Sequence, residues 1–133
     1  MTMADRDHVL ELAAEKLPAG ARYGIGLELE ALGRELAPGE RLLELATGCD
    51  DLSCGVVAVT TGRVLWAPSM YPVVHVRCWA SEDVRPFGSP VAGTGGLVSL
   101  GDADVWRVTQ LLPSSAARRI AERLSAEASL QPA

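Results

Sequence analysis

The sequence predicts one α+β domain, in which seven short strands form a bent β-sheet and helices lie at both ends of the chain. Three observations support this fold class. Residues 55–60 and 63–67 are β-branched and aromatic runs around a Thr-Gly turn, which is the pattern of a β-hairpin. Residues 114–128 place their apolar side chains on one helical face, which needs a sheet to cover. The chain has 133 residues, 48% of them hydrophobic, which is enough for a core without a metal or a disulfide.

Two helices are expected before the sheet. The first covers residues 4–17 and has Asp5 and Asp7 near its N-terminus, where the helix dipole favours negative charge. The second covers residues 22–36, although each glycine within it disfavours a helix by up to about 1 kcal/mol. Its apolar side chains follow a helical repeat: Ile25, Leu29, Leu32 and Leu36.

The strands are located by alternating apolar side chains and by the Gly, Pro and Asp residues between them. The glycine-rich connection at residues 88–96 is expected to be a mobile loop, and Pro113 and Ser114 suit the start of the final helix. The expected strands are residues 41–47, 55–60, 63–67, 73–79, 84–87, 97–100 and 104–111.

Two segments resemble the short bacterial PH-like domains of the YokE-like kind. Residues 36–43, Leu-Ala-Pro-Gly-Glu-Arg-Leu-Leu, are similar to that family's L-x-P-G-E segment before its first strand. Residues 55–66 are similar to its G-x-ϕ-x-ϕ-T-x-x-R-ϕ-ϕ-ϕ hairpin, in which ϕ is apolar. The resemblance implies a bent, partly open barrel of seven strands that is plugged by the C-terminal helix. The chain then divides into an N-terminal helical extension (1–37), the PH-like domain (38–128) and a tail (129–133).

The charge balance restricts the class of ligand. Twelve basic and seventeen acidic residues give a net charge of -5, and no basic run occurs, so nucleic acid and anionic lipid are disfavoured as partners. No apolar run is long enough to span a membrane. Three cysteines without a cationic, hydrophobic leader indicate a reducing cytoplasm.

Four side chains are of the types that zinc uses as ligands: Cys49, Cys54, Cys78 and His75. The C-x4-C spacing is looser than that of the usual zinc knuckle. His75 and Cys78 are three residues apart in an expected strand, which places their side chains on opposite faces. We therefore expect buried free thiols and no metal or other cofactor.

The loop between the first two expected strands is acidic. In phosphoinositide-binding PH domains this loop carries the basic residues that hold the headgroup, whereas here it carries Asp50 and Asp51 and no cation. Because carboxylates repel a phosphate, we do not expect phosphoinositide binding. The two adjacent acids are also a weak signal for a Ca²⁺ site.

Five residues are candidates for an interaction site: Arg63, Trp66, His75, Arg77 and Trp79. Arg63 can contact an anion or brace the turn beside it, and we favour bracing, because the resembled family has an Arg there as part of its fold signature. The tryptophans can fill the core or anchor a partner, and we favour the core.

The sequence contains no G-x-S-x-G elbow, H-E-x-x-H pair or P-loop, and its histidines are His8 and His75. We therefore expect a non-enzymatic, cytoplasmic module that binds a protein partner or a second copy of itself, through a sheet edge or a groove. The alternative is a small-molecule-binding protein or an enzyme that uses the barrel mouth near His75, Arg77 and Trp79.

Overall fold

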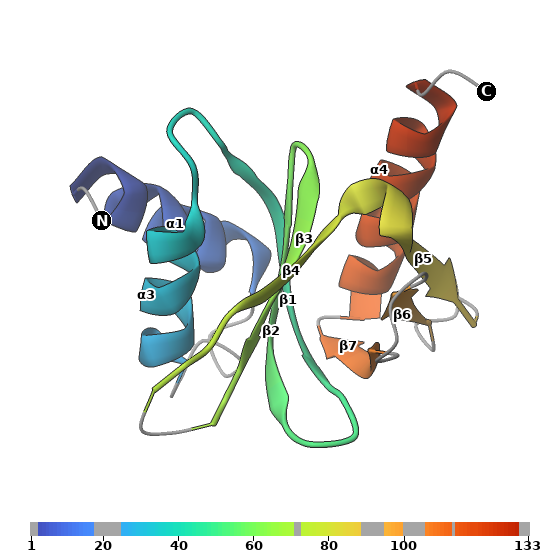
Figure 1. The fold of residues 1–133 in the computed structure, drawn as a ribbon, viewed down its shortest axis with the longest axis horizontal. Coiled ribbons are helices and arrows are strands. Elements are labelled where there is room, and N and C mark those ends of the chain that lie inside the picture. Colours follow the sequence, from blue (N-terminus) through green and yellow to red (C-terminus); the bar gives the residue numbers. More distant parts are fainter. Residues whose placement is uncertain are drawn as a thin grey trace.

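The computed structural model describes residues 3–17, 25–70, 73–88, 95–99, 106–112 and 114–130. Its elements follow the expected order, with two helices, then the strands, then the final helix (Figure 1). They are α1 (Met3–Lys16), α3 (Gly26–Glu35), β1 (Leu42–Cys49), β2 (Cys54–Thr60), β3 (Arg63–Pro68), β4 (Arg77–Ala80), the 3-10 turn η1 (Ser81–Asp83), β5 (Val84–Phe87), β6 (Gly96–Ser99), β7 (Arg107–Leu112) and α4 (Ser114–Leu130).

The seven strands form one antiparallel, curled half-barrel sheet in the order β4-β3-β2-β1-β7-β6-β5. The predicted hairpin is present, with β2 paired to β3 from Gly55↔Pro68 to Val59↔Val64. The α+β class, the seven strands and the helices at both ends are therefore confirmed.

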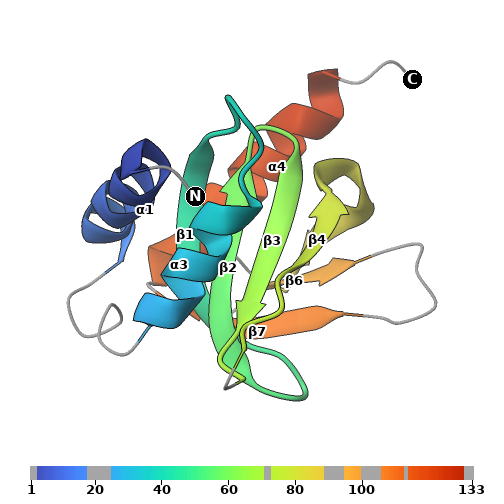
Figure 2. The ribbon, with the colours of Figure 1, turned by 60° about the vertical axis from the view of Figure 1, so that its left-hand side comes forward.

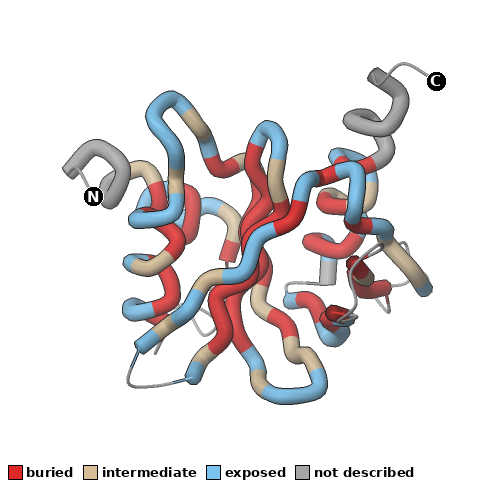
Figure 3. The backbone as a smooth tube through the Cα atoms, in the orientation of Figure 1, coloured by how far each residue is buried: buried red, intermediate tan, exposed pale blue. Residues whose placement is uncertain are grey.

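The central strands are buried on both faces. Figure 1 shows α1 and α3 on one side of these strands, and α4 with β5–β7 on the other, and Figure 2 shows α3 crossing the sheet. In β2 every residue from Gly55 to Thr60 is buried, and Figure 3 shows this burial along the middle of the sheet. A strand covered on both faces needs apolar residues at successive positions, and this explains the continuous run of β2.

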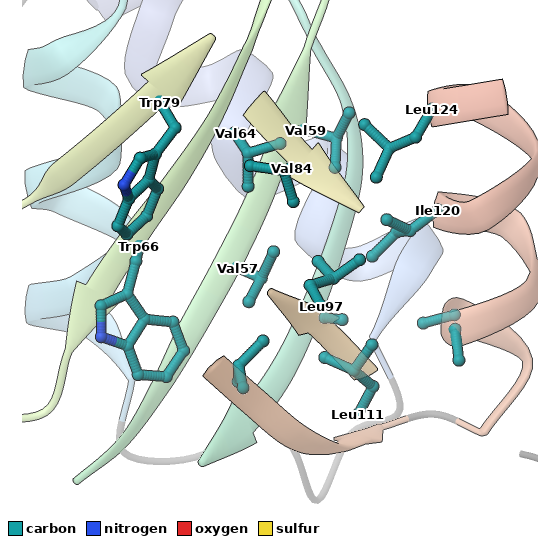
Figure 4. Close-up of a cluster of buried hydrophobic side chains, with 14 of the residues drawn as sticks. Val57, Val59, Val64, Trp66, Trp79, Val84, Leu97, Leu111, Ile120 and Leu124 are labelled. Carbon is teal, nitrogen blue, oxygen red and sulfur yellow. The ribbon is translucent and has the colours of Figure 1, made fainter. Parts of the chain in front are cut away.

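The inner face of the sheet packs against α4 (Figure 4). Ile120 and Leu124 of the helix lie among the side chains of the β-strands, as the amphipathic pattern predicts. The sheet's contribution to this core includes Val57, Val59, Val64, Trp66 and Leu97.

The outer face packs against the two N-terminal helices. Leu29 and Leu32 of the predicted apolar stripe are buried there, together with Val9 of α1. The sheet residues beneath them alternate with those of the inner core: Leu45, Val56, Ala58, Leu65 and Ala67.

The fourth strand is shorter than predicted. It begins at Arg77 instead of residue 73, and its ladder with β3 ends at the pair Trp66↔Arg77. In the same register His75 would face Pro68, whose nitrogen has no hydrogen to donate, so the ladder stops nearby. Val74 and Val76 instead pack at the edge of the outer core.

Several predicted boundaries lie outside the described residues. They are the start of the second helix at residues 22–24, most of the expected mobile loop (89–94), the end of the sixth strand at Leu100 and the start of the seventh at residues 104–105.

The expectation of free thiols is wrong for two of the three cysteines. Cys49 and Cys54 form a disulfide, because β1 continues to Cys49 and β2 begins at Cys54, which places the two directly opposite each other. Asp50 shapes the turn between them: its N–H donates to the Ser53 carbonyl (2.8 Å), and its Oδ1 accepts from the N–H groups of Leu52 (2.9 Å) and Ser53 (2.8 Å). Cys78 is free as expected, but it is exposed and not buried. The cysteines therefore no longer argue for a reducing compartment.

Protein purified without reductant should expose one reactive thiol, Cys78, and three after reduction under denaturing conditions. Cys54→Ser should lower the free energy of unfolding by about 2 kcal/mol, which is the loop-entropy contribution of a disulfide that joins residues five apart. Thiol titration and urea denaturation measure both effects. Cys78→Ser is the matched control and should change stability by less than about 0.5 kcal/mol. Three reactive thiols in the native, unreduced protein would contradict the disulfide.

Candidate functional site

Arg63 closes a polar network between the β2–β3 hairpin and the end of α3. Its Nε and Nη2 donate to the two carboxylate oxygens of Glu40, at 2.9 Å and 2.5 Å. Nη2 also donates to the backbone carbonyl of Glu35 at 2.8 Å. The hydroxyl of Thr60 donates to Glu40 Oε2 at 2.8 Å and accepts the N–H of Arg63 at 3.0 Å. Arg63 thus links the hairpin to the end of α3. Contact with a ligand anion, the less favoured alternative, stays a hypothesis.

The Pro-Gly-Glu segment supplies the carboxylate for this network. Gly39 has a φ of 81°, which a residue without a Cβ adopts at low cost. The turn is closed by Glu40, whose N–H donates to the Ala37 carbonyl at 2.9 Å and whose Oε1 accepts the Ala37 N–H at 3.0 Å. The Arg63 guanidinium holds the pKa of Glu40 down at about 2, from an ordinary value of 4.5, and the carboxylate in turn raises the pKa of Arg63.

The Glu40 network should weaken in acid. Because the pKa of Glu40 is lower in the folded than in the unfolded chain, its contribution is complete above pH 4.5 and is lost as the pH falls towards 2. The shift corresponds to about 3 kcal/mol. We expect Glu40→Gln to lower stability at pH 7 by a similar amount and to flatten the dependence of unfolding free energy on pH between 4.5 and 2. Urea denaturation at successive pH values measures this. Exposed Glu35→Gln is the control, and equal acid slopes for Glu40→Gln and wild type would contradict the prediction.

Arg77, Trp79 and two further tryptophans form a stack. The guanidinium carbon of Arg77 lies 5.0 Å from the Trp79 ring centroid. Trp79 stacks on Trp106 with a centroid separation of 4.3 Å, and Trp106 meets Trp66 at 5.7 Å. Trp66, Trp79 and Trp106 are 1%, 6% and 2% exposed, so their rings belong to the core.

The five sequence candidates therefore do not form one surface. Trp66 and Trp79 meet through Trp106 inside the half-barrel, and Arg77 covers the outer end of that stack. Arg63 is engaged with Glu40. His75 is exposed on the connection that precedes β4.

Glu44 is the centre of a second polar cluster, which the sequence analysis missed. Its side chain is 3% exposed and lies between cations from helices on both faces of the sheet. Lys16 Nζ of α1 is 3.4 Å from Oε1, while Nε of Arg119 and of Arg123 in α4 are 3.1 Å and 3.7 Å from the carboxylate. β1 pairs with β7 at Thr47 and Cys49. Glu44 precedes these paired residues in β1, and its ion pairs connect α1 on one face of the sheet to α4 on the other.

An apolar surface around α3 was also missed. Leu10, Leu27 and Val73 are 48%, 50% and 59% exposed. They border two hollows, of about 120 Å³ and 220 Å³, that lie beside α3 and share Glu30. The first is lined by Val9, Leu10, Gly26, Leu29 and Glu30, and the second by Leu27, Glu30, Ala31, Arg34, Val73 and Val74. We call these residues the α3 surface. The signal in the sequence was Leu27, which falls outside the buried stripe of its helix.

Within the described part of the chain, no three His, Cys, Asp or Glu side chains gather in a way that could hold a metal ion. Cys49 and Cys54 are bonded to each other and so are not zinc ligands. None of the described helices combines the length and apolar character of a membrane span.

Comparison with solved structures identifies the fold. The chain is similar to the DH/PH domains of p115-RhoGEF, with a TM-score of 0.56, 8% identity, and coverage of 97% of this chain and 43% of that one. It is also similar to the DH/PH domains of PDZ-RhoGEF in complex with GTP-gamma-S activated RhoA (TM-score 0.53, 10% identity, coverage 92% and 39%). A third similar structure is the DH/PH domain of human ARHGEF11 in a ternary complex with human RhoA and its inhibitor. Its TM-score is 0.55 at 10% identity, and the match covers 94% of this chain and 40% of that one.

The chain spans less than half the length of each of these structures. No protein-family model matches it, and no curated protein matches it. At identities of 8–10% the likeness shows the fold alone, and that fold is PH-like.

Proposed function

We propose that this chain is a non-enzymatic, PH-like module that binds a protein partner. The α3 surface is the observation that carries the proposal. It presents three half-exposed aliphatic side chains beside two hollows, and clustered apolar exposure of this kind is typical of docking sites. Each hollow suits a single side chain, since a cavity of about 150 Å³ holds benzene.

A small-molecule site near His75, Arg77 and Trp79 has less support. Trp79 is buried in the aromatic stack, and Arg77 lies over its ring. The two hollows beside α3 are smaller than the roughly 300–1,000 Å³ of typical ligand pockets. Phosphoinositide binding also has little support, because the Asp50 carboxylate accepts hydrogen bonds within its own turn and Asp51 is exposed beside it.

We further propose that the chain belongs to the bacterial PH-like domains of the YokE-like kind. A cytoplasmic location has less support, because the Cys49–Cys54 disulfide is typical of an oxidising compartment. Support for the family comes from the two motifs of the resemblance. Glu40 of the first motif binds Thr60 and Arg63 of the second, which gives a physical reason for the two to occur together. The proposed PH-like domain remains residues 38–128, with α1 and α3 as an extension that covers its outer face.

A photo-cross-linking amino acid at position 27 tests protein binding in the native cell. We expect discrete cross-linked proteins that are absent when the same amino acid replaces Leu52, which is 82% exposed on the β1–β2 loop. A purified cross-linked protein should then bind the unmodified chain in calorimetry. Identical products from positions 27 and 52, together with a melting temperature raised by a metabolite, would favour the small-molecule alternative.

A further inference from the structure

We infer that the α3 surface binds a basic amphipathic segment of its protein partner, with aliphatic side chains in the two hollows and Lys or Arg side chains against the exposed carboxylates of α1 and α3. This inference rests on the proposed function and specifies the chemistry of the partner. The residues that carry it lie outside the two motifs at 36–43 and 55–66: they are on α1, on α3 and in the connection before β4.

The geometry of α3 suits a segment with two apolar anchors. The residues that line the larger hollow from this helix are spaced at i, i+3, i+4 and i+7, and so form one outward stripe: Leu27, Glu30, Ala31 and Arg34. Glu30 lines both hollows, so a side chain in either one lies next to this residue. Amphipathic helices bind grooves of this kind through apolar anchors at helical spacing.

The exposed charges of the two helices beside these hollows favour a basic partner. Among the described residues of α1 and α3, four carboxylates are exposed: Glu11, Glu15, Glu30 and Glu35. The one exposed cation on the same described residues is Arg34, which is paired with Glu30 at 2.5 Å. Lys16 of α1 is mostly buried, and its Nζ lies 3.4 Å from a carboxylate oxygen of Glu44 and 3.8 Å from one of Glu15. Cations of the segment would therefore meet two helices whose described, exposed side chains carry more negative than positive charge, which favours association and selects among partners.

The same charges argue against a second copy as the occupant. In a symmetric dimer the α3 surface would meet itself, which would bring together two copies of helices whose described, exposed side chains are acidic on balance. Like charges across an interface are costly. A partner segment that carries Lys or Arg removes this repulsion.

Three synthetic peptides of 14 residues test the inference: a Leu/Lys amphipathic helix, a Leu/Glu helix of the same pattern, and a scrambled Leu/Lys sequence without an apolar face. Calorimetry and amide chemical shifts of the full chain are the measurements. We expect the patterned Leu/Lys peptide to bind at least tenfold more tightly than the other two. The largest shifts should lie at residues 9–10, 26–34 and 73–74, and raising the salt concentration should weaken binding.

Variants of the chain provide the matched controls. Leu27→Asp should weaken binding of the Leu/Lys peptide at least tenfold. Leu52→Asp changes a leucine that is more exposed (82% against 50%) and lies on the β1–β2 loop, and should leave binding unchanged. The double variant Glu11→Gln and Glu30→Gln should weaken it several-fold. Thermal unfolding checks that each variant is folded. If Leu27→Asp does not fold, Val73→Asp takes its place.

Equal binding of the Leu/Glu peptide, equal losses in Leu27→Asp and Leu52→Asp, or shifts centred away from α3 would each overturn the inference. A concentration-dependent dimer in light scattering that Leu27→Asp abolishes would identify the occupant as a second copy. If position 27 cross-links to a protein partner while the Leu/Lys peptide does not bind, the partner chemistry is wrong and the proposed function stands. If position 27 yields no cross-linked protein and no peptide binds, both fail.

Discussion

Glu44→Gln should lower the free energy of unfolding by about 3 kcal/mol, a large part of the roughly 5–15 kcal/mol that stabilises a typical domain. The substitution keeps the size and shape of the side chain but removes its charge. Arg119 and Arg123 would then lose this counter-charge, and Lys16 would keep only its longer contact with Glu15. Since the carboxylate is 3% exposed, water cannot replace the lost interaction at that position.

Urea denaturation measures this effect, and the surface pair of α4 supplies the control. Glu122 accepts a hydrogen bond from Arg118 at 3.1 Å, but its side chain is 65% exposed, so Glu122→Gln should cost less than about 0.5 kcal/mol. Arg119→Met should fall between the two, because Glu44 would keep its other cations. A Glu44→Gln midpoint equal to that of Glu122→Gln would show that the cluster does not join the layers.

Trp66→Ala should lower stability by about 3–5 kcal/mol, the usual cost of removing a buried aromatic side chain. The ring is 1% exposed on the inner face of the sheet and contacts Trp106. Its loss would leave a cavity between β3 and the strands that α4 covers (Figure 4). Circular dichroism in urea is the suitable measurement, because the substitution itself alters tryptophan fluorescence.

Two further variants separate packing from binding. Trp66→Phe keeps an aromatic ring and should cost less than Trp66→Ala, whereas exposed Leu52→Ala should stay within about 0.5 kcal/mol of wild type. A folded Trp66→Ala protein of normal stability that loses only partner binding would reverse this assignment and make Trp66 an interaction residue.

The N-terminal helices α1 and α3 move the expected binding site from the outer face of the sheet to their own surface. They cover the outer face of β1–β3 with their own apolar core, so that face is not available for docking in the described structure. What they leave at the surface is the far side of α3, with Leu27 beside a hollow. The extension outside the family resemblance thus supplies the proposed interaction site.

Local chemistry was sufficient to predict the elements. The β-branched and aromatic runs at 55–60 and 63–67 pair as a hairpin because a short Thr-Gly turn brings them together. The apolar face of the final helix covers the sheet through side chains that include Ile120 and Leu124. The motif residue Arg63 was expected to brace its turn, and its contacts with Glu40 have that geometry. These features depend on neighbours in sequence or on a periodicity that a single element displays.

The tertiary structure alone decided features that depend on register and on distant neighbours. Extending β1 by two residues beyond Thr47 brought Cys49 opposite Cys54, and a loop assignment had hidden this pairing. Glu44 gains its cations from helices 28 residues before it and 75 residues after it, which no local pattern records. The α3 surface exists because α1 and the connection before β4 flank one helix. Sequence specifies periodicity within an element, whereas burial and ion pairing follow from how separate elements pack, and that is why the fold was predictable and the candidate site was not.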